Sequence, residues 1–168
     1  MQGASTQDDG DESGGGLHDE IRSRALKLLT TREHSRLELS RKLRKRGYPE
    51  AAVDAVLARL MNDDLLNEER LVAAYVAERL SKGFGPVRIR FELREKGLSD
   101  LQIDPHLQFD EEVLMRRLSA VYHKRYGDDP ANGWNDCAKR SRFLEYRGFP
   151  ASLVARMIER DCLDNPAR

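Results

Sequence analysis

Residues 43–49 read LRKRGYP, and the same pattern returns twice along the chain. Residues 93–99 read LREKGLS, and residues 144–150 read LEYRGFP. In each string a leucine is followed after three residues by a glycine and then by an apolar residue. Glycine readily adopts the left-handed conformation that ends many helices, so each string predicts the last turn of a helix. The glycines are 50 and 51 residues apart, which predicts three copies of one helical unit.

Helix-start signals and helical periodicity surround these strings. Ser35 with Glu38 predicts a capping box, in which the hydroxyl and the carboxylate satisfy unpaired amides at the start of a helix. Ser99 with Gln102 repeats this arrangement in the second copy. Apolar residues at i, i+3, i+4 and i+7 mark a further helix at Val53, Val56, Leu57 and Leu60. Because no alternating β-branched run predicts a strand, we expect an all-α fold of three tandem three-helix repeats, forming an elongated, curved array.

The chain is expected to begin and end with short tails. Its first 16 residues are rich in Gly, Ser, Asp and Gln and have no apolar periodicity, so they lack the means to bury a core. The predicted organisation is a disordered acidic tail over residues 1–16, repeats over residues 17–62, 63–109 and 110–163, and a C-terminal tail over residues 164–168.

The formal net charge of zero hides an asymmetry. The chain has 29 acidic and 29 basic residues, but residues 1–20 contain acidic residues and no Lys or Arg. The remainder is therefore basic, which suits a polyanion or an acidic protein face. No apolar run approaches the ~20 residues that a membrane helix needs. Cys137 and Cys162 have no zinc-ligand spacing, so we expect packing residues or exposed bystanders in a soluble protein of the reducing cytoplasm, without metal or cofactor.

Basic residues cluster in the predicted middle helix of each repeat. The candidate binding residues are Arg32, Arg36, Arg41, Lys42, Lys45 and Arg46 in the first repeat, Arg88, Arg90, Arg94 and Lys96 in the second, and Lys139, Arg140, Arg142 and Arg147 in the third. Equivalent positions in an array face the same way, so the clusters would merge into one stripe that attracts phosphates. The alternative interpretation is a set of solvated helix faces with local ion pairs.

The motifs that suggest chemistry have simpler structural explanations. Residues 83–86 read GFGP but lack the Lys-Ser/Thr ending and the preceding strand of a phosphate loop, so the glycines are expected to close one helix and Pro86 to begin the next. His34 is expected at the surface or beside a helix cap, and no catalytic set accompanies it. Trp134 and Tyr146 are open candidates for stacking on bases, whereas Phe149 is expected in the core. These observations favour a protein that is not an enzyme.

Three signatures together resemble one family. Residues 32–36 (REHSR) with Glu38-Leu39 and Lys42-Leu43 are similar to the first-repeat signature of the RecX family. Residues 85–89 (GPVRI) with Glu92-Leu93 and Lys96-Gly97 resemble its second-repeat signature, and Phe143-Leu144 with residues 147–149 (RGF) resembles the third. The likeness spans about residues 18–160, and the acidic tail lies outside it.

The resemblance implies a cytoplasmic, non-enzymatic modulator of the RecA recombinase. RecX proteins bind in the groove of the RecA nucleoprotein filament and suppress its ATPase, strand exchange and co-protease activity, which regulates DNA repair and the SOS response. The implied partners are the RecA filament and single- or double-stranded DNA, bound directly or through the filament, with no membrane and no cofactor, and we expect a monomer. Arg36, Lys42, Arg88 and Arg147 are the leading contacts because they fall within the signatures. The alternatives are a stand-alone DNA-binding regulator resembling a helix-turn-helix protein, and a pure scaffold.

Overall fold

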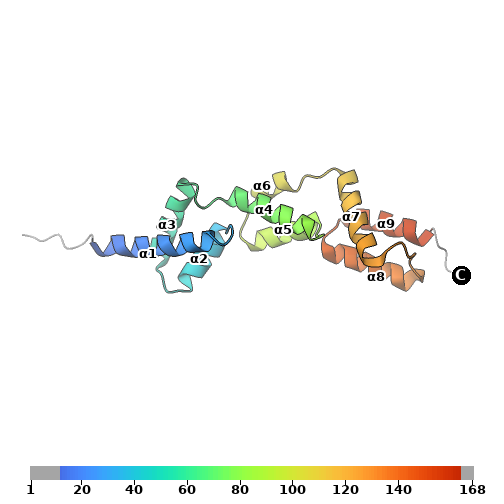
Figure 1. Ribbon diagram of the computed structural model, residues 1–168, viewed down its shortest axis with the longest axis horizontal. Coiled ribbons are helices and arrows are strands. Elements are labelled where there is room, and N and C mark those ends of the chain that lie inside the picture. The colour runs from blue at the N-terminus through green and yellow to red at the C-terminus, as the bar shows by residue number, and fades with distance from the viewer. Residues whose placement is uncertain (1–11, 164–168) are drawn as a thin grey trace, which may run out of the picture. The chain divides into compact units, whose positions relative to one another are not determined.

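A computed structural model describes residues 12–163 of the 168-residue chain, with side chains from residue 15 to residue 159. Throughout this range the regular structure is helical, as the sequence predicts, and the helices follow one another in groups of three (Figure 1). The described part divides between Leu71 and Val72 into two compact units. None of the described helices is long and apolar enough to cross a membrane.

The first unit is built around the first repeat. It contains α1 (Glu12–Leu29), α2 (Arg36–Arg44), α3 (Glu50–Asn62) and the start of α4 (Glu68–Ser81). Both α1 and α2 pack against α3. The core that they share includes the four periodic residues of the third helix, and its buried members are Ile21, Ala25, Leu39, Leu43, Val53, Val56, Leu57, Leu60 and Leu66.

The second unit contains the rest of α4 and the helices of the second and third repeats. These are α5 (Pro86–Glu95), α6 (Asp100–Ile103), the 3-10 helix η1 (Asp104–His106), α7 (Glu111–Tyr126), α8 (Gly133–Arg147) and α9 (Ala151–Leu163). The third helix of the second repeat is only four residues long before it tightens into η1. Pro105 accounts for this difference from α3 and α9, because proline lacks the amide that would continue an α-helix.

Local signals in the sequence are realised at the helix ends. Gly47, Gly97 and Gly148 have φ angles of +92°, +87° and +91°, so all three repeat glycines adopt the left-handed conformation. Both predicted capping boxes, at Ser35 and at Ser99, are formed. Each repeat therefore ends its middle helix by the same device.

The third repeat has its own apolar core between α7, α8 and α9. Phe149 is buried in it, as predicted, and packs with Leu118, Leu144 and Val154. Cys137 is also buried in this core, as expected of a packing residue, and in addition it is disulfide-bonded, which its spacing in the sequence does not indicate. The chain's other cysteine, at position 162, lies beyond the described side chains.

The N-terminal helix begins earlier than the sequence suggests. The structure places residues 12–16 in α1, although they belong to the predicted tail. The three glycines in this stretch have weak helix propensity, but extending a helix that already exists costs less than nucleating a new one. Residues 1–11 and 164–168, which make up the rest of the two predicted tails, lie outside the described residues.

Candidate functional site

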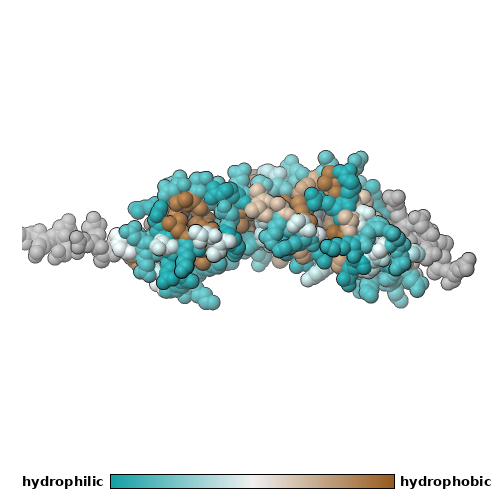
Figure 2. All heavy atoms as spheres, viewed as in Figure 1, coloured by the Kyte–Doolittle hydropathy of each residue, from teal (hydrophilic) through white to brown (hydrophobic). Residues whose placement is uncertain are grey.

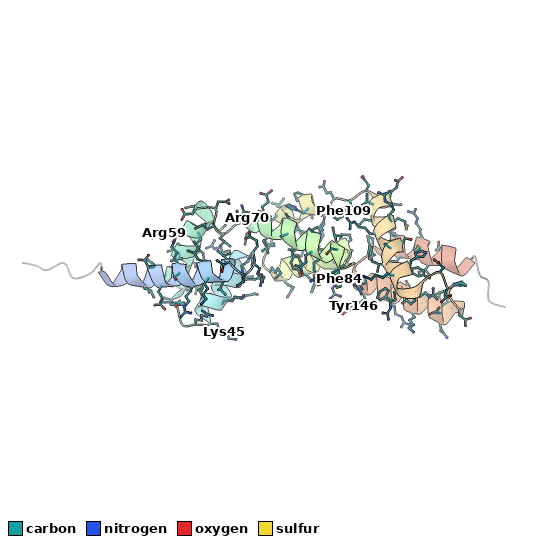
Figure 3. The ribbon with its side chains drawn as sticks, viewed as in Figure 1. Lys45, Arg59, Arg70, Phe84, Phe109 and Tyr146 are labelled. Carbon is teal, nitrogen blue, oxygen red and sulfur yellow. The ribbon has the colours of Figure 1, made fainter. Side chains whose placement is uncertain are left out.

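The middle helix of the first repeat carries exposed cations at its C-terminal end. Arg41, Lys45 and Arg46 are exposed, and within the part of the chain that the structure describes they form no ion pair. Lys45 projects outward beyond the end of α2 (Figure 3). We call these three residues the α2 cationic end. Because no carboxylate among the described residues neutralises them, they are available to an anionic partner.

Two further candidates of the first repeat lie at the start of α2 in exposed ion pairs. Arg32 pairs with Glu38 at 3.0 Å, and Arg36 pairs with Asp54 at 3.3 Å. Both arginine side chains are about half exposed, so these pairs contribute little stability and can exchange partners.

Lys42 has a more specific role in holding the loop before α2. Its ammonium group lies 2.8 Å from Nε2 of His34, whose Nδ1 lies 2.9 Å from the carbonyl oxygen of Arg32. These contacts require a neutral ring that donates from Nδ1 and accepts at Nε2. His34 is buried beside the cap of α2, so it is cap-adjacent as predicted but not a surface residue. Burial is the main cause that lowers its pKa below the ordinary 6.5.

In the second repeat, Glu92 organises the surroundings of Arg88. The Glu92 carboxylate accepts hydrogen bonds from Arg79 at 2.7 Å, from Arg88 at 3.0 Å and from the hydroxyl of Tyr75 at 2.9 Å. Burial opposes ionisation of Glu92, but these three hydrogen bonds outweigh it and leave the pKa lowered. Burial and the bond to Glu92 raise the pKa of Tyr75 to about 12. Arg88 is therefore partly a structural residue.

The other basic candidates of the second repeat are also engaged. Arg94 makes two hydrogen bonds of 2.8 and 2.7 Å to the carboxylate of Asp100, and Arg90 pairs with both Asp100 and Asp104. The Lys96 ammonium lies 5.2 Å from the ring centre of Tyr75. For this helix the alternative interpretation of local ion pairs describes the geometry better than an open basic face does.

Arg140 is unsuited to binding a partner. Only 6% of its side chain is exposed, and its guanidinium donates to the Asp136 carboxylate at 3.0 Å, the Tyr122 hydroxyl at 2.6 Å and the Asp129 carbonyl at 2.8 Å. A basic residue next to Lys139 suggests a charged surface, but the helical turn points Arg140 into the core. We therefore correct its assignment to that of a structural residue.

The two remaining exposed candidates of the third repeat lie on α8. Lys139 and Arg142 are both exposed, and Arg142 donates to the carbonyl of Ala138 at 3.2 Å. They remain available to a partner.

Arg147 lies where the second and third repeats meet within the second unit. Its guanidinium donates to the carbonyl of Lys82 at 3.0 Å and lies 5.0 Å from the ring centre of Phe84. Arg88 lies 4.7 Å from the same ring and 4.7 Å from the ring of Tyr146. Phe84 and Tyr146 accordingly lie near each other in Figure 3. Tyr146 is 72% exposed, which leaves it open to a partner, as is Trp134 at 84%.

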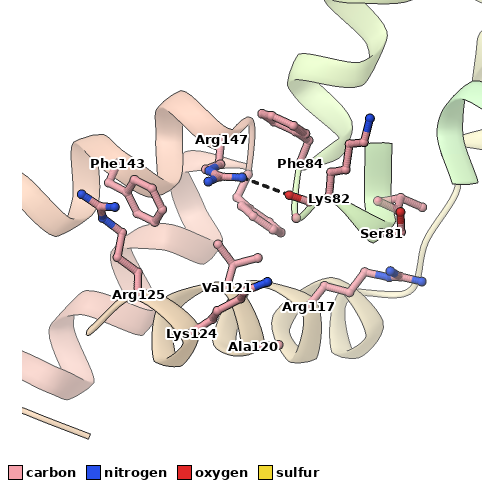
Figure 4. A pocket seen from close by; sticks show the side chains of 13 residues that line it. Ser81, Lys82, Phe84, Arg117, Ala120, Val121, Lys124, Arg125, Phe143 and Arg147 are labelled. Atoms are coloured by element: carbon pink, nitrogen blue, oxygen red, sulfur yellow. Dashed lines mark hydrogen bonds between the residues drawn. The ribbon is translucent and has the colours of Figure 1, made fainter. Parts of the chain in front are cut away.

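A groove lies beside this junction, and the sequence interpretation missed most of it. Its volume is about 480 Å³, and it is lined by Leu80, Ser81, Lys82, Gly83, Phe84, Arg117, Ala120, Val121, Lys124, Arg125, Phe143, Arg147 and Phe149 (Figure 4). Only Arg147 among these had been selected as a binding residue. Arg117, Lys124 and Arg125 belong to α7, the first helix of a repeat, whereas the basic clusters that the sequence indicates lie in the middle helices. Their spacing of i, i+7 and i+8 around Val121 is a signal that could have found them.

Most of the visible surface of the described residues is hydrophilic, with smaller apolar areas between (Figure 2). Within the described residues, no group of three or more His, Cys, Asp or Glu is placed to hold a metal ion.

Known proteins match this chain along most of its length. Residues 22–60 match the family profile described as "RecX, first three-helix domain", and residues 67–107 match "RecX, second three-helix domain". A Regulatory protein RecX from Ectopseudomonas mendocina (strain ymp) is 39% identical over 138 residues, which cover 82% of this chain and 92% of that protein. The chain belongs to the RecX family. RecX of Pseudomonas entomophila (strain L48) is 37% identical over 145 residues, 86% of this chain and 94% of its own length.

Solved structures of RecX agree with the fold. A crystal structure of regulatory protein RecX superposes with a TM-score of 0.79 at 26% identity, covering 95% of this chain and 82% of that chain. RecX from Lactobacillus salivarius gives a TM-score of 0.74 at 21% identity, covering 89% of this chain and 99% of its own, and supports the fold alone. The family is therefore one of regulatory proteins built from tandem three-helix domains.

Proposed function

We propose that this protein is a cytoplasmic, non-enzymatic inhibitor of RecA that binds in the groove of the RecA–DNA filament. In this proposal it suppresses the ATPase, strand exchange and co-protease activities, and thereby regulates DNA repair and the SOS response. Membership of the RecX family carries the proposal, since the relatives are named as regulatory proteins. Repeated helical domains suit a filament, because several weak contacts along one partner raise the effective concentration for each next contact.

The α2 cationic end supports the choice of an anionic partner. Arg41, Lys45 and Arg46 place three charges, which no described carboxylate neutralises, together on one exposed helix end. Such charges bind phosphates or an acidic protein face with an affinity that falls as salt is added. We propose that they contact the filament together with Lys139 and Arg142 of the third repeat.

A titration of RecA's single-strand-dependent ATPase tests the function. We expect the protein to inhibit at well below one molecule per RecA protomer. Arg41→Glu with Lys45→Glu should raise the concentration needed for half-inhibition by about tenfold, because two favourable charges become repulsive. Unchanged ATPase at stoichiometric addition would remove the proposal.

Lys27→Glu with Arg59→Glu provides a matched control in the same unit. Each of the two double variants replaces one Lys and one Arg, and all four positions are exposed and lie at or next to the last turn of a helix. The loss of stability from the helix dipole should therefore be similar in both. Equal losses of inhibition in the two double variants would show that net charge, and not the α2 cationic end, is responsible. Sequence-selective binding to duplex DNA without any effect on RecA would favour the stand-alone regulator instead.

A further inference from the structure

The groove between α7, α8 and the α4–α5 connection has a lining of one charge sign. Five of its residues are cations, namely Lys82, Arg117, Lys124, Arg125 and Arg147, and none of its lining residues is Asp or Glu. Concave sites lined by one sign of charge concentrate counter-ions more strongly than flat surfaces do. The groove therefore has a positive potential that favours the binding of an anion.

The cations on α7 are available to a ligand. Arg117 and Lys124 are exposed and form no ion pair with any residue that the structure describes. Arg125 has aromatic neighbours, with its guanidinium 4.8 Å from the ring centre of Phe143. Lys82 is the exception, because it pairs with Glu78 outside the groove.

Arg147 is fixed in position before any ligand arrives. Its guanidinium lies between two rings, 5.0 Å from the centre of Phe84 and 5.2 Å from that of Phe143, and donates to the Lys82 carbonyl (Figure 4). Because the guanidinium of Arg147 makes only this one hydrogen bond among the described residues, its other N–H groups can donate to a ligand. A cation held in this way loses little conformational entropy when it binds a phosphate.

Apart from its cations the lining of the groove is largely apolar, and we call this part the apolar floor. Val121 and the rings of Phe143 and Phe149 line it together with Leu80 and Ala120. A lining that combines apolar and cationic side chains matches a nucleotide unit, which has a flat base and an anionic phosphate. The volume of about 480 Å³ suits a ligand of that size and is too small for a double helix.

We infer that this groove binds a single-stranded nucleic-acid strand, with phosphates on Arg117, Lys124 and Arg147 and a base against the apolar floor. The inference deepens the proposed function, on which it rests, by assigning the DNA contact of a RecA–DNA filament to a defined groove. An acidic peptide is the competing ligand, but a peptide carboxylate does not require an aromatic floor, and five cations without one acid suit the regular charge of a polyanion better.

The test is direct binding of a fluorescent oligodeoxythymidylate to the full chain without RecA, followed by anisotropy at several salt concentrations. Arg117→Glu should weaken binding by about tenfold, and adding Lys124→Glu should weaken it further and flatten the salt dependence by about one unit of slope per lost contact. Arg116→Glu is the matched control, because Arg116 is the adjacent residue of α7, is 70% exposed and does not line the groove. It should change the affinity less than threefold.

Three results would overturn the inference. They are no binding of the oligonucleotide by the unmodified protein, equal losses for Arg117→Glu and Arg116→Glu, and equal affinity for a polyglutamate peptide of the same charge. The RecA ATPase titration on the same proteins separates this inference from the proposed function. If the protein inhibits RecA but the groove variants bind the oligonucleotide as well as the unmodified protein does, the groove inference is wrong and the proposed function stands. If the groove variants lose oligonucleotide binding but the unmodified protein does not inhibit RecA, the groove inference stands and the proposed function is wrong.

Discussion

The amide of Gly85, just before α5, donates a hydrogen bond of 2.8 Å to the carbonyl of Arg147, the last residue of α8. Next to it, the amide of Val87 donates to the carbonyl of Gly148 at 3.0 Å. The start of one helix and the end of another thus satisfy each other's unpaired backbone groups across two repeats. Such a close approach of two main chains explains why glycines occupy both sides.

Replacing Gly148 by alanine should destabilise the second unit by about 2–4 kcal/mol, because strain and overpacking act together. The new Cβ would lie 2.3 Å from Cβ of Arg88, and φ at this position is +91°. Gly47→Ala is the control at the equivalent position of the first repeat, since φ is +92° there but nothing lies within 4 Å of the added atom. It should cost only about 1–2 kcal/mol, from the left-handed backbone alone. Urea unfolding measures both costs, and equal values would show that the contact between the repeats contributes nothing.

Much of the fold could be predicted from the sequence because its signals are local. The three repeat glycines end helices by a backbone conformation that glycine alone adopts easily, and the capping boxes at Ser35 and Ser99 use partners three residues away. The third helix of the second repeat is shorter than α3 and α9. The repeat pattern alone does not indicate this length, because it depends on the single Pro105.

The site was harder to predict because it depends on contacts between distant residues. Nothing in the neighbourhood of Arg140 shows that it turns inward to Tyr122, which is 18 residues away. The groove likewise needs α7, α8 and the α4–α5 connection to come together, so the basic clusters of the middle helices indicate only Arg147 among its residues. Charge and periodicity predicted which segments are basic but not which cations are free.

The neutral His34 ring should make the first unit sensitive to mild acid. Its pKa is lowered in the folded chain, mainly by burial, whereas the unfolded chain titrates near 6.5. At pH values between these two, the unfolded chain binds more protons, so the stabilising contribution is complete above 6.5 and is lost as the pH falls towards the folded pKa. The free energy of unfolding should therefore decrease over this window, and His34→Gln should flatten that part of the profile.

An NMR titration of the ring checks this assignment directly. Lys42→Met should raise the pKa of His34 part of the way to its ordinary value, because the ammonium group opposes protonation but burial remains. A pKa of His34 at or above 6.5 in the unmodified protein would contradict the neutral, buried ring.

Glu92→Gln should lower the stability of the second unit by about 1–3 kcal/mol, since three donors lose a charged acceptor. The pKa of Glu92 is lowered in the folded chain, so its contribution is present above pH 4.5 and is lost as the pH falls through the folded value. The variant should accordingly lose stability at pH 7 and match the unmodified protein more closely in acid. Spectrophotometric titration offers a second reading, because Tyr75, with a pKa of about 12, should titrate at a lower pH once the carboxylate is gone. An unchanged Tyr75 titration would mean that burial alone holds the phenol neutral.

Arg140→Met should destabilise the second unit by about 3–5 kcal/mol, because it leaves Asp136 and the Tyr122 hydroxyl without their buried partner. Its neighbour supplies the control, since Lys139 is exposed and the stability of Lys139→Met should stay within about 0.5 kcal/mol of that of the unmodified protein.

At temperatures where both proteins are folded, we expect Arg140→Met to bind a single-stranded oligonucleotide within about twofold of the unmodified protein, because a side chain with 6% exposure has no face to offer a phosphate. Chemical unfolding measures the stability of each variant, and fluorescence anisotropy measures its affinity for the oligonucleotide. A stable Arg140→Met protein with weakened oligonucleotide binding would return Arg140 to the binding residues and require the third repeat to open before it meets its partner.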